Sequence, residues 1–221
     1  EMVFNTFGEL MKNGIDLVKF CITTVLTECK DDLENLNNFL SKGVIDRLEH
    51  IVSTKEKIIT HSDAVKLINS ELDYFVKKYK KGKLMDKLEP DDDLGSTHEA
   101  YLTDKFNTCV FVTHWPISIK SFYMKQCDDG TCESFDLLIP GIGELIGASQ
   151  REDNYYKLIT MMDKKNVDKE ALSFYTDLRK YGSCPHGGFG LGFDRLLMLV
   201  TGITNIKDVI PFPVHYKNCM Y

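Results

Sequence analysis

The sequence predicts an α+β fold, in which helices flank an antiparallel sheet built mainly from the second half of the chain. Stretches rich in β-branched and aromatic residues follow one another after residue 107, with turn residues between them. Before that point, apolar residues recur mostly at helical spacing. Strands that follow strands, without a helix between each pair, indicate α+β and exclude an alternating α/β pattern.

Composition and charge narrow the function classes. The 221 residues are 43% hydrophobic and 27% charged, which is ordinary for a soluble globular protein of one domain. A net charge of −6 argues against indiscriminate nucleic-acid binding, although one local basic face remains compatible with RNA. The apolar run at residues 196–200 is too short to cross a membrane, and the first residues lack a signal-peptide pattern. We expect a cytoplasmic protein with no membrane partner.

The first part of the chain is expected to be mainly helical. The expected elements are, in order, helices at 8–29 and 31–51, a strand at 57–60, a helix capped by residues 61–63, and a short helix capped by residues 96–99. Residues 77–87 contain six lysines, and a solvated loop is favoured over a nucleic-acid contact, because blocks of like charge usually face water.

The second part is expected to form the sheet. Strands are predicted at 108–112, 121–124, 135–139, 143–149 and 187–192, with helices at 154–164, 169–181 and 193–201. Residues 1–4 are typical of the end of a strand, whereas a natural N-terminus more often starts with a polar tail. We therefore expect the chain to be part of a longer polypeptide.

The cysteines suggest thiols more than disulfides. There are seven, and they lack the paired spacing of a zinc site. Cys127 and Cys132 bracket a hairpin-turn signature, so a disulfide that clamps this turn is one interpretation. Two free thiols in a reducing cytosol is the favoured one.

A glycine-rich strand that leads into an arginine is the first candidate for chemistry. Residues 187–192 contain four glycines, and a strand without side chains usually has something packed flat against its backbone. Arg195 follows at the start of the next predicted helix, where a guanidinium suits a phosphate. Alone, this pattern is equally compatible with glycine kinks that allow tight packing of a strand and a helix.

Two carboxylates among apolar residues form the second candidate. Asp136 and Glu144 lie on neighbouring predicted strands joined by a Pro-Gly turn. Such a pair suits Mg²⁺, which usually takes one or two carboxylates plus phosphate oxygens and water. Arg151 follows on the same strand as Glu144 and could donate to a carboxylate or an amide oxygen. The alternative is an internal network of salt bridges among these three residues.

Taken together in this order, the motifs resemble those of a class II aminoacyl-tRNA synthetase, with the glycine-rich piece similar to the third signature motif of that class. Further stretches resemble the asparaginyl-tRNA synthetase family within the aspartyl, asparaginyl and lysyl subgroup. They are residues 93–95 (Asp-Leu-Gly), 98–99 (His-Glu), 112–116 (Val-Thr-His-Trp-Pro), 119–124 (Ile-Lys-Ser-Phe-Tyr-Met), 147–153 (Gly-Ala-Ser-Gln-Arg-Glu-Asp) and 209–213 (Val-Ile-Pro-Phe-Pro). The resemblance covers essentially the whole chain, and only residues 77–87 depart from it.

The resemblance implies a role for each matching position. Glu144, with Asp136, would hold Mg²⁺ against the phosphates of ATP, and Arg195 would bind the γ-phosphate. Arg151 would read the side-chain amide of L-asparagine, with Gly147 beside the amino acid. The remaining ATP-facing positions would be Gly190, Gly192, Phe193 and Asp194. The implied chemistry is formation of asparaginyl-adenylate, followed by transfer of the asparaginyl group to tRNA(Asn).

The resemblance also implies what lies elsewhere. The first two class motifs and the anticodon-binding domain do not match any residues here, so residues 1–221 are expected to be the C-terminal part of a catalytic domain. The complete enzyme would be a homodimer, and this part alone is expected to be inactive. Aspartyl-tRNA synthetase, a synthetase-like asparagine synthetase and a non-catalytic module with this fold remain alternatives.

Overall fold

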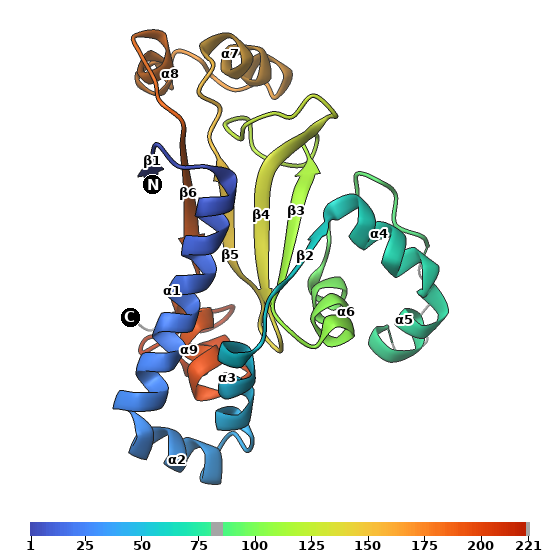
Figure 1. Cartoon of the computed structure of the whole chain (residues 1–221), viewed down its shortest axis with the longest axis vertical. Helices are drawn as coiled ribbons and strands as arrows, with labels where there is room; N and C mark the ends of the chain where they lie inside the picture. The colour runs from blue at the N-terminus through green and yellow to red at the C-terminus, as the bar shows by residue number, and fades with distance from the viewer. Residues whose placement is uncertain (81–85, 220–221) are drawn as a thin grey trace.

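A computed structural model describes residues 1–80 and 86–219, and it is built on one six-stranded sheet (Figure 1). The strands are β1 (Met2–Val3), β2 (Lys57–Thr60), β3 (Val110–Pro116), β4 (Thr131–Ile139), β5 (Gly143–Gln150) and β6 (His186–Leu191). Their order across the sheet is β1-β6-β5-β4-β3-β2. The pairing is antiparallel throughout the described strands except between β2 and β3, which run parallel. The predicted α+β class is confirmed.

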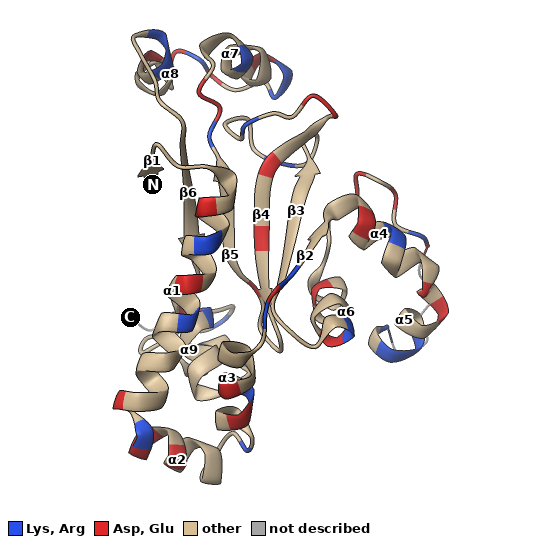
Figure 2. Ribbon diagram, viewed as in Figure 1, with Lys and Arg blue, Asp and Glu red and all other residues tan. Residues whose placement is uncertain are grey.

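Helices surround the sheet. They are α1 (Phe7–Glu28), α2 (Lys30–Phe39), α3 (Val44–Ser53), α4 (His61–Ser70), α5 (Leu72–Tyr79), α6 (Ser96–Phe106), α7 (Tyr155–Lys164), α8 (Ser173–Lys180) and α9 (Phe193–Thr201), with a short 3₁₀ turn, η1 (Ile206–Asp208). Figure 2 shows that most charged residues lie on the helices and loops, whereas the strand ribbons carry few charges, among them the acidic segments on β4.

Alternation along the strands gives the sheet two different faces. Phe135, Leu137 and Ile139 of β4 point to one face and pack with apolar residues of α1, α3 and α9. Val110 and Val112 of β3 point to the other face, where they pack with α4, α5 and α6. Of these helices, α4 packs against β2 and β3, whereas α6 also reaches the ends of β4 and β5. The same face of β4, β5 and β6 is otherwise left to polar residues and glycines, and the candidate site lies there.

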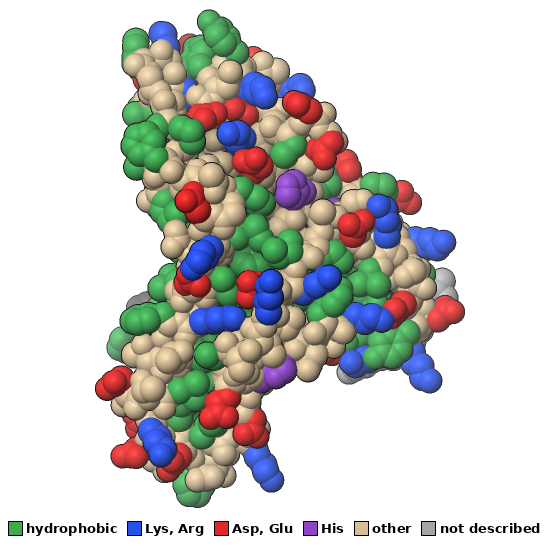
Figure 3. Space-filling model, in the orientation of Figure 1, with side chains coloured by type: hydrophobic (Ala, Val, Ile, Leu, Met, Phe, Trp, Pro, Cys, Tyr) green, Lys and Arg blue, Asp and Glu red, His purple; other side chains and the backbone are tan. Residues whose placement is uncertain are grey.

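The face that α1 crosses is apolar. In Figure 3, hydrophobic side chains gather there between α1 and the edge of the sheet. A groove of about 450 Å³ lies in this region, lined among others by Met11, Ile15, Ile58 and Phe111. Along the described residues, no helix is both long and apolar enough to cross a membrane.

The single helix predicted over residues 31–51 is wrong, because the chain breaks it into α2 and α3. Gly43 lies between them in the left-handed region, at φ 83°. A non-glycine residue adopts this conformation at a steric cost, so glycine permits the turn. The main-chain N–H of Gly43 donates to the side-chain oxygen of Asn37, which ties the turn to α2.

The strand predicted at residues 121–124 is also wrong. Only an isolated bridge joins Met124 to Arg151. The segment folds back over the end of β5, where the N–H of Lys125 donates to the carbonyl of Gln150 and that of Glu152 to the carbonyl of Tyr123. Its aromatic residues therefore serve contacts to the site, although their composition is typical of a strand.

Smaller predictions need correction at helix ends. Thr60, and not residues 61–63, caps α4, because its hydroxyl accepts from the N–H of Asp63. Gly95 precedes α6, and the ring of His98 accepts from the Gly95 N–H. Of the lysine-rich stretch predicted as a loop, Lys77, Lys78 and Tyr79 belong to α5, where cations near a helix C-terminus are favourable. Residues 81–85 of that stretch lie outside the described residues.

The described cysteines, which are all seven of the chain, are free. Burial raises the pKa of the Cys132 thiol to about 11, and burial likewise raises that of the half-buried Cys127. The favoured interpretation of Cys127 and Cys132 as thiols is confirmed, and the turn-clamping disulfide is not formed.

Candidate functional site

The register of β4, β5 and β6 brings the predicted residues together on one face. Asp136 lies opposite Gly147, and Gly147 lies opposite Gly190. The neighbouring row is made by Ser134, Ser149 and Gly188. Because side chains two residues apart share a face of a strand, both rows point to the side away from α1. One carboxylate, two hydroxyl groups and three glycines from different parts of the sequence thus line one surface.

A pocket of about 250 Å³ occupies the end of this surface next to α9. It is lined by Glu144, Leu145, Gly147, Gly190, Gly192, Phe193, Asp194, Arg195 and Ile206. All six positions predicted to face ATP are in this set. Added to Gly190, a Cβ would meet no atom within 4 Å, so the strand backbone is open to the pocket. This leaves room for a flat group to lie on it.

The two predicted metal ligands converge at Gly147. A Cβ placed on Gly147 would lie 2.7 Å from Oε1 of Glu144 and 3.7 Å from Oδ1 of Asp136. A side chain at this position would therefore displace the Glu144 carboxylate, whereas Asp136 would be left in ordinary contact with it. The glycine leaves room for Glu144 to lie beside Asp136.

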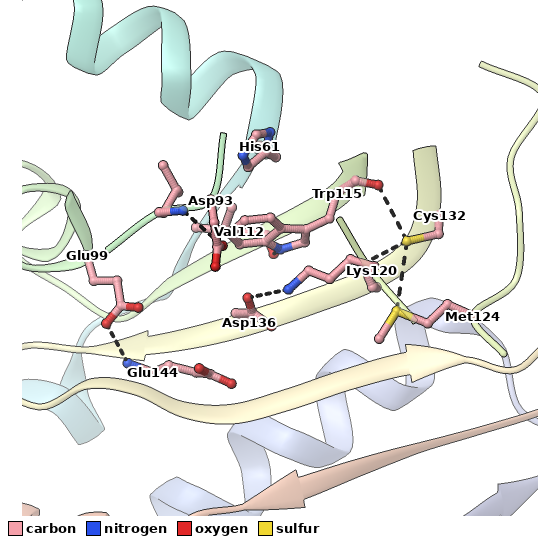
Figure 4. Close-up of polar contacts among 12 residues, drawn as sticks. His61, Asp93, Glu99, Val112, Trp115, Lys120, Met124, Cys132, Asp136 and Glu144 are labelled. Carbon is pink, nitrogen blue, oxygen red and sulfur yellow. Dashed lines mark hydrogen bonds and ion pairs between the residues drawn. The ribbon is translucent and has the colours of Figure 1, made fainter. Parts of the chain in front are cut away.

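Asp136 is buried beside a lysine. Lys120 Nζ lies 2.9 Å from Oδ2 of Asp136, and the two side chains are 17% and 14% exposed (Figure 4). Lys120 also lies over the ring of Trp115, 3.8 Å from its centroid. Burial raises the pKa of the Asp136 carboxyl to about 6, while Lys120 opposes the rise and Glu144 adds to it. The carboxyl thus depends on neighbouring positive charge to stay ionised near neutral pH.

The donor set fits a magnesium ion. Among the described residues, no group of three or more His, Cys, Asp or Glu side chains is arranged to hold a metal. Two convergent carboxylates next to an open pocket suit Mg²⁺, because this ion usually takes one or two carboxylates and completes its shell with water and phosphate oxygens. A zinc-type cage is excluded for the same described residues.

Arg195 stands at the rim of the pocket. It is the third residue of α9, and Nη1 of its guanidinium donates to the main-chain carbonyl of Glu144. The side chain is exposed to solvent. With five N–H donors, a guanidinium held through one nitrogen still offers others in a fixed direction. The contact orients Arg195 toward the side of the pocket where Glu144 lies.

Arg151 lies at the opposite end of the surface in a different setting. Its side chain is only 15% exposed, and its Nη2 lies 2.7 Å from Oε1 of Glu1. Nη1 donates to the hydroxyl of Ser149, and the guanidinium lies 5.2 Å from the centroid of Tyr123. Although burial acts to raise it, the pKa of the Glu1 carboxyl is lowered by the hydrogen bonds and charge of Arg151. Arg151 is thus locked in one orientation by three neighbours.

A histidine next to this end is held in one orientation by its partners. Nε2 of His186 lies 3.0 Å from Nη2 of Arg179, which can only donate, so this ring nitrogen accepts. The other, Nδ1, lies 2.9 Å from the carbonyl of Cys184 and donates to it. His186 therefore links Arg179 to the carbonyl of Cys184 in a local structural contact.

Sequence reasoning missed several residues of the site. Lys120, Ser149 and Glu1 were not assigned roles, although each contacts a residue that was. Lys120, Ser149 and Tyr123 lie in the stretches that carry the family resemblance, so the resemblance contained the signal. Glu1 lies outside those stretches and contacts Arg151 across 150 positions, a pairing that only the fold reveals.

The chain matches the family model of class II tRNA synthetases (D, K and N) over residues 1–216. Among curated proteins, it is 44% identical over 218 residues to an asparagine–tRNA ligase of Clostridium botulinum (strain Hall), a match that covers 96% of this chain and 44% of that protein. An asparagine–tRNA ligase of Bacteroides fragilis is 40% identical over 99% of this chain and 46% of its own length. The chain therefore spans less than half the length of these relatives.

Solved structures give the same result. The asparaginyl-tRNA synthetase of Entamoeba histolytica in complex with asparaginyl-adenylate superposes with a TM-score of 0.82 at 31% identity, over 99% of this chain and 47% of that one.

Proposed function

The chain belongs to the class II tRNA synthetases for aspartate, lysine and asparagine, and on that premise we propose that it supplies one wall of the active site of an asparagine–tRNA ligase. The observation that carries the proposal is the surface formed by β4, β5 and β6. At one end of this surface, an open pocket lies beside Asp136, Glu144 and Arg195. At the other end lies Arg151, whose guanidinium is already held in one orientation. The curated asparagine–tRNA ligases that are similar to this chain support asparagine as the amino acid.

The nucleotide would occupy the pocket next to α9. Gly190 offers backbone with open space above it, so a purine or ribose can lie against the strand. Gly192, Phe193 and Asp194 would form the border of this pocket. Arg195, which is held toward Glu144, would bind the γ-phosphate through its remaining donors.

Asp136 and Glu144 would hold Mg²⁺, which when bound neutralises phosphate charge. The carboxylates supply the negative charge, and Lys120 keeps the buried Asp136 ionised before the ion arrives. This assignment agrees with their convergence at Gly147 and with the absence of larger ligand groups among the described residues.

The amino acid would extend from Gly147 toward Arg151. The guanidinium donates only, so it suits the carbonyl oxygen of the asparagine side chain. Glu1 balances the charge of Arg151, which makes this end less suited to an additional negative charge on the ligand. Ser149 and Tyr123 already hold the guanidinium in one orientation, so its side chain loses little conformational entropy when asparagine binds.

The reaction follows from this placement. A carboxylate oxygen of asparagine attacks the α-phosphorus of ATP, the bond from that phosphorus to the bridging oxygen breaks, and pyrophosphate leaves with the electron pair. Positioning and charge stabilisation suffice for such a displacement, without a protein nucleophile. The activated asparaginyl group then passes to the terminal ribose of tRNA(Asn), with AMP as the leaving group.

The proposal extends to the complete protein. Residues 1–221 would be the C-terminal part of its catalytic domain, since the chain covers 44–46% of the curated relatives. The rest of the active site, the contacts to tRNA and a homodimer interface would come from the remainder of the polypeptide. We place the protein in the cytoplasm, where charged tRNA is used.

The test is amino-acid-dependent ATP–pyrophosphate exchange by the full-length polypeptide that contains these residues. Asparagine should support exchange, and aspartate should support little. Charging of tRNA with asparagine should follow. Exchange with aspartate alone would point to an aspartyl-tRNA synthetase, and ammonia-dependent formation of asparagine would point to an asparagine synthetase. A folded protein that neither binds ATP nor supports exchange would contradict the proposal.

A further inference from the structure

A carboxylate outside the predicted site contacts the site's backbone. Glu99 lies in the first turn of α6, a helix anchored by the fully buried Tyr101 and Leu102. Its Oε2 accepts a hydrogen bond from the main-chain N–H of Glu144 at 3.1 Å, across 45 positions of sequence (Figure 4).

The turn between β4 and β5 is shaped to receive this carboxylate. Gly143 has a φ of 84°, and a Cβ placed on it would lie 2.4 Å from Oε2 of Glu99. Glycine is therefore needed at Gly143 both for its conformation and for the approach of Glu99. The contact is closely packed, and it joins α6 to Glu144, one of the two proposed ligands of Mg²⁺.

Glu144 is held at both of its main-chain polar groups. Glu99 accepts from its N–H, and Arg195 donates to its carbonyl. The side chain of Glu144 is left to reach over Gly147, toward Asp136. With both peptide groups fixed, the position of the Glu144 Cα–Cβ bond, from which the carboxylate extends, is set before any ligand binds.

Burial raises the pKa of the Glu99 carboxyl, partly offset by its hydrogen bond from Glu144. A half-buried carboxylate facing the like charge of Glu144 carries an electrostatic cost.

We propose that Glu99 is a positioning residue that holds the main chain of Glu144, so that the Glu144 carboxylate is directed toward the magnesium–nucleotide site. The inference rests on the proposed function, because it assigns Glu99 a role in that site. Glu99 acts through Glu144 and touches no reacting atom. It links the helical layer α4–α6 to the nucleotide end of the sheet.

The experiment compares Glu99→Ala with a matched change on the same helix, Asp104→Ala, in the full-length polypeptide. Asp104 also accepts side-chain hydrogen bonds, from Lys78 and Tyr79, but on the side of α6 that faces α5. The readout is ATP binding by titration calorimetry over a range of Mg²⁺ concentrations. Glu99→Ala should raise the Mg²⁺ concentration for half-saturation by about tenfold. Asp104→Ala should not change it, even where both variants lower the melting temperature.

Two further variants keep the inference testable if Glu99→Ala folds poorly. Glu99→Gln keeps an oxygen that can accept from the Glu144 N–H, so it should retain most of the wild-type Mg²⁺ dependence. Gly143→Ala should shift that dependence as Glu99→Ala does, because its Cβ displaces the carboxylate. In the double variant, Gly143→Ala should add less to the shift in Mg²⁺ dependence caused by Glu99→Ala than it causes on its own.

The outcomes separate the two proposals. If the wild-type protein shows no Mg²⁺-dependent binding of ATP, the proposed function and this inference both fail. If the wild-type protein binds and Glu144→Ala abolishes the Mg²⁺ dependence, while Glu99→Ala and Gly143→Ala leave it unchanged, only the role of Glu99 is overturned.

Discussion

The two arginines of the site are prepared in different ways. Arg151 is 15% exposed and is fixed by Glu1, Ser149 and Tyr123, so its donors point in one direction before any ligand arrives. Arg195 is exposed and is guided by the main-chain carbonyl of Glu144. A group that must distinguish one small side chain from another gains from a rigid setting. A group that must bind a mobile triphosphate gains from open access.

The largest loss of activity is expected for a change of Arg195, at the end of the surface where the open pocket lies. Arg195→Ala removes the donors proposed for the γ-phosphate, and should lower asparagine-dependent ATP–pyrophosphate exchange by about 100- to 1,000-fold. Because the side chain is exposed, the melting temperature should change little. Steady-state exchange kinetics and a thermal melt measure the two quantities. A large loss of stability would show that Arg195 has a structural role instead.

Replacing Arg151 should weaken the binding of asparagine and leave the binding of ATP nearly unchanged. Arg151→Gln removes a charged donor to the asparagine amide, and should raise the KM for asparagine by about 10- to 100-fold. The KM for ATP should stay close to that of the wild-type protein, since the nucleotide pocket lies at the other end of the surface. An equal rise in both constants would contradict the division of the site into two ends.

Two glycines on β6 offer a matched comparison of the two ends. Gly190→Ala adds a methyl group into open space, so it should preserve stability but raise the KM for ATP by about 3- to 10-fold. Gly188→Ala places a Cβ 2.5 Å from the carboxyl group of Glu1, so it should disturb Arg151 and raise the KM for asparagine. Kinetics with each substrate varied in turn measures both. If Gly190→Ala raised the KM for asparagine and Gly188→Ala raised the KM for ATP, the assignment of the two ends of the surface would be contradicted.

The smallest effect concerns the pH dependence of the Glu1–Arg151 pair. The pKa of Glu1 is lowered in the folded protein below its ordinary 4.5. Its stabilising contribution is therefore present above pH 4.5 and is lost as the pH falls through the lowered value. Since Glu1 is 60% exposed, Glu1→Gln should lower the melting temperature at pH 7 by only about 1–3 °C.

Thermal melts of the wild-type protein and Glu1→Gln across this pH range test the sign. The difference between them should shrink at acidic pH. A difference that grew as the pH fell would contradict the assignment.

Local patterns predicted much of the fold and of the site. Arg195 was expected at the start of a helix because apolar spacing begins directly after the glycine-rich strand, and it is the third residue of α9. The approach of Asp136 and Glu144 was expected because a Pro-Gly turn joins their strands, and they meet at Gly147. Whether these residues bind ATP and Mg²⁺ stays a prediction.

The contacts that depend on the tertiary fold could not be predicted. Glu99 reaches Glu144 across 45 positions, and Glu1 reaches Arg151 across 150, so no spacing rule connects them. Residues 121–124 have the composition of a strand, but their backbone bonds to residues 150–152 hold them over the site. The break at Gly43 interrupts a helical pattern that apolar spacing alone would continue.

The proposed binding of the two substrates is tested most directly by a crystal structure of the full-length polypeptide with asparagine, Mg²⁺ and a non-hydrolysable ATP analogue. We expect the asparagine amide oxygen within hydrogen-bond distance of Arg151, which should keep its contacts with Ser149 and Glu1. The triphosphate should lie along β6 beside Glu144, with its γ-phosphate on Arg195. An amide bound away from Arg151, or a triphosphate bound elsewhere while Arg195 faces solvent, would contradict it.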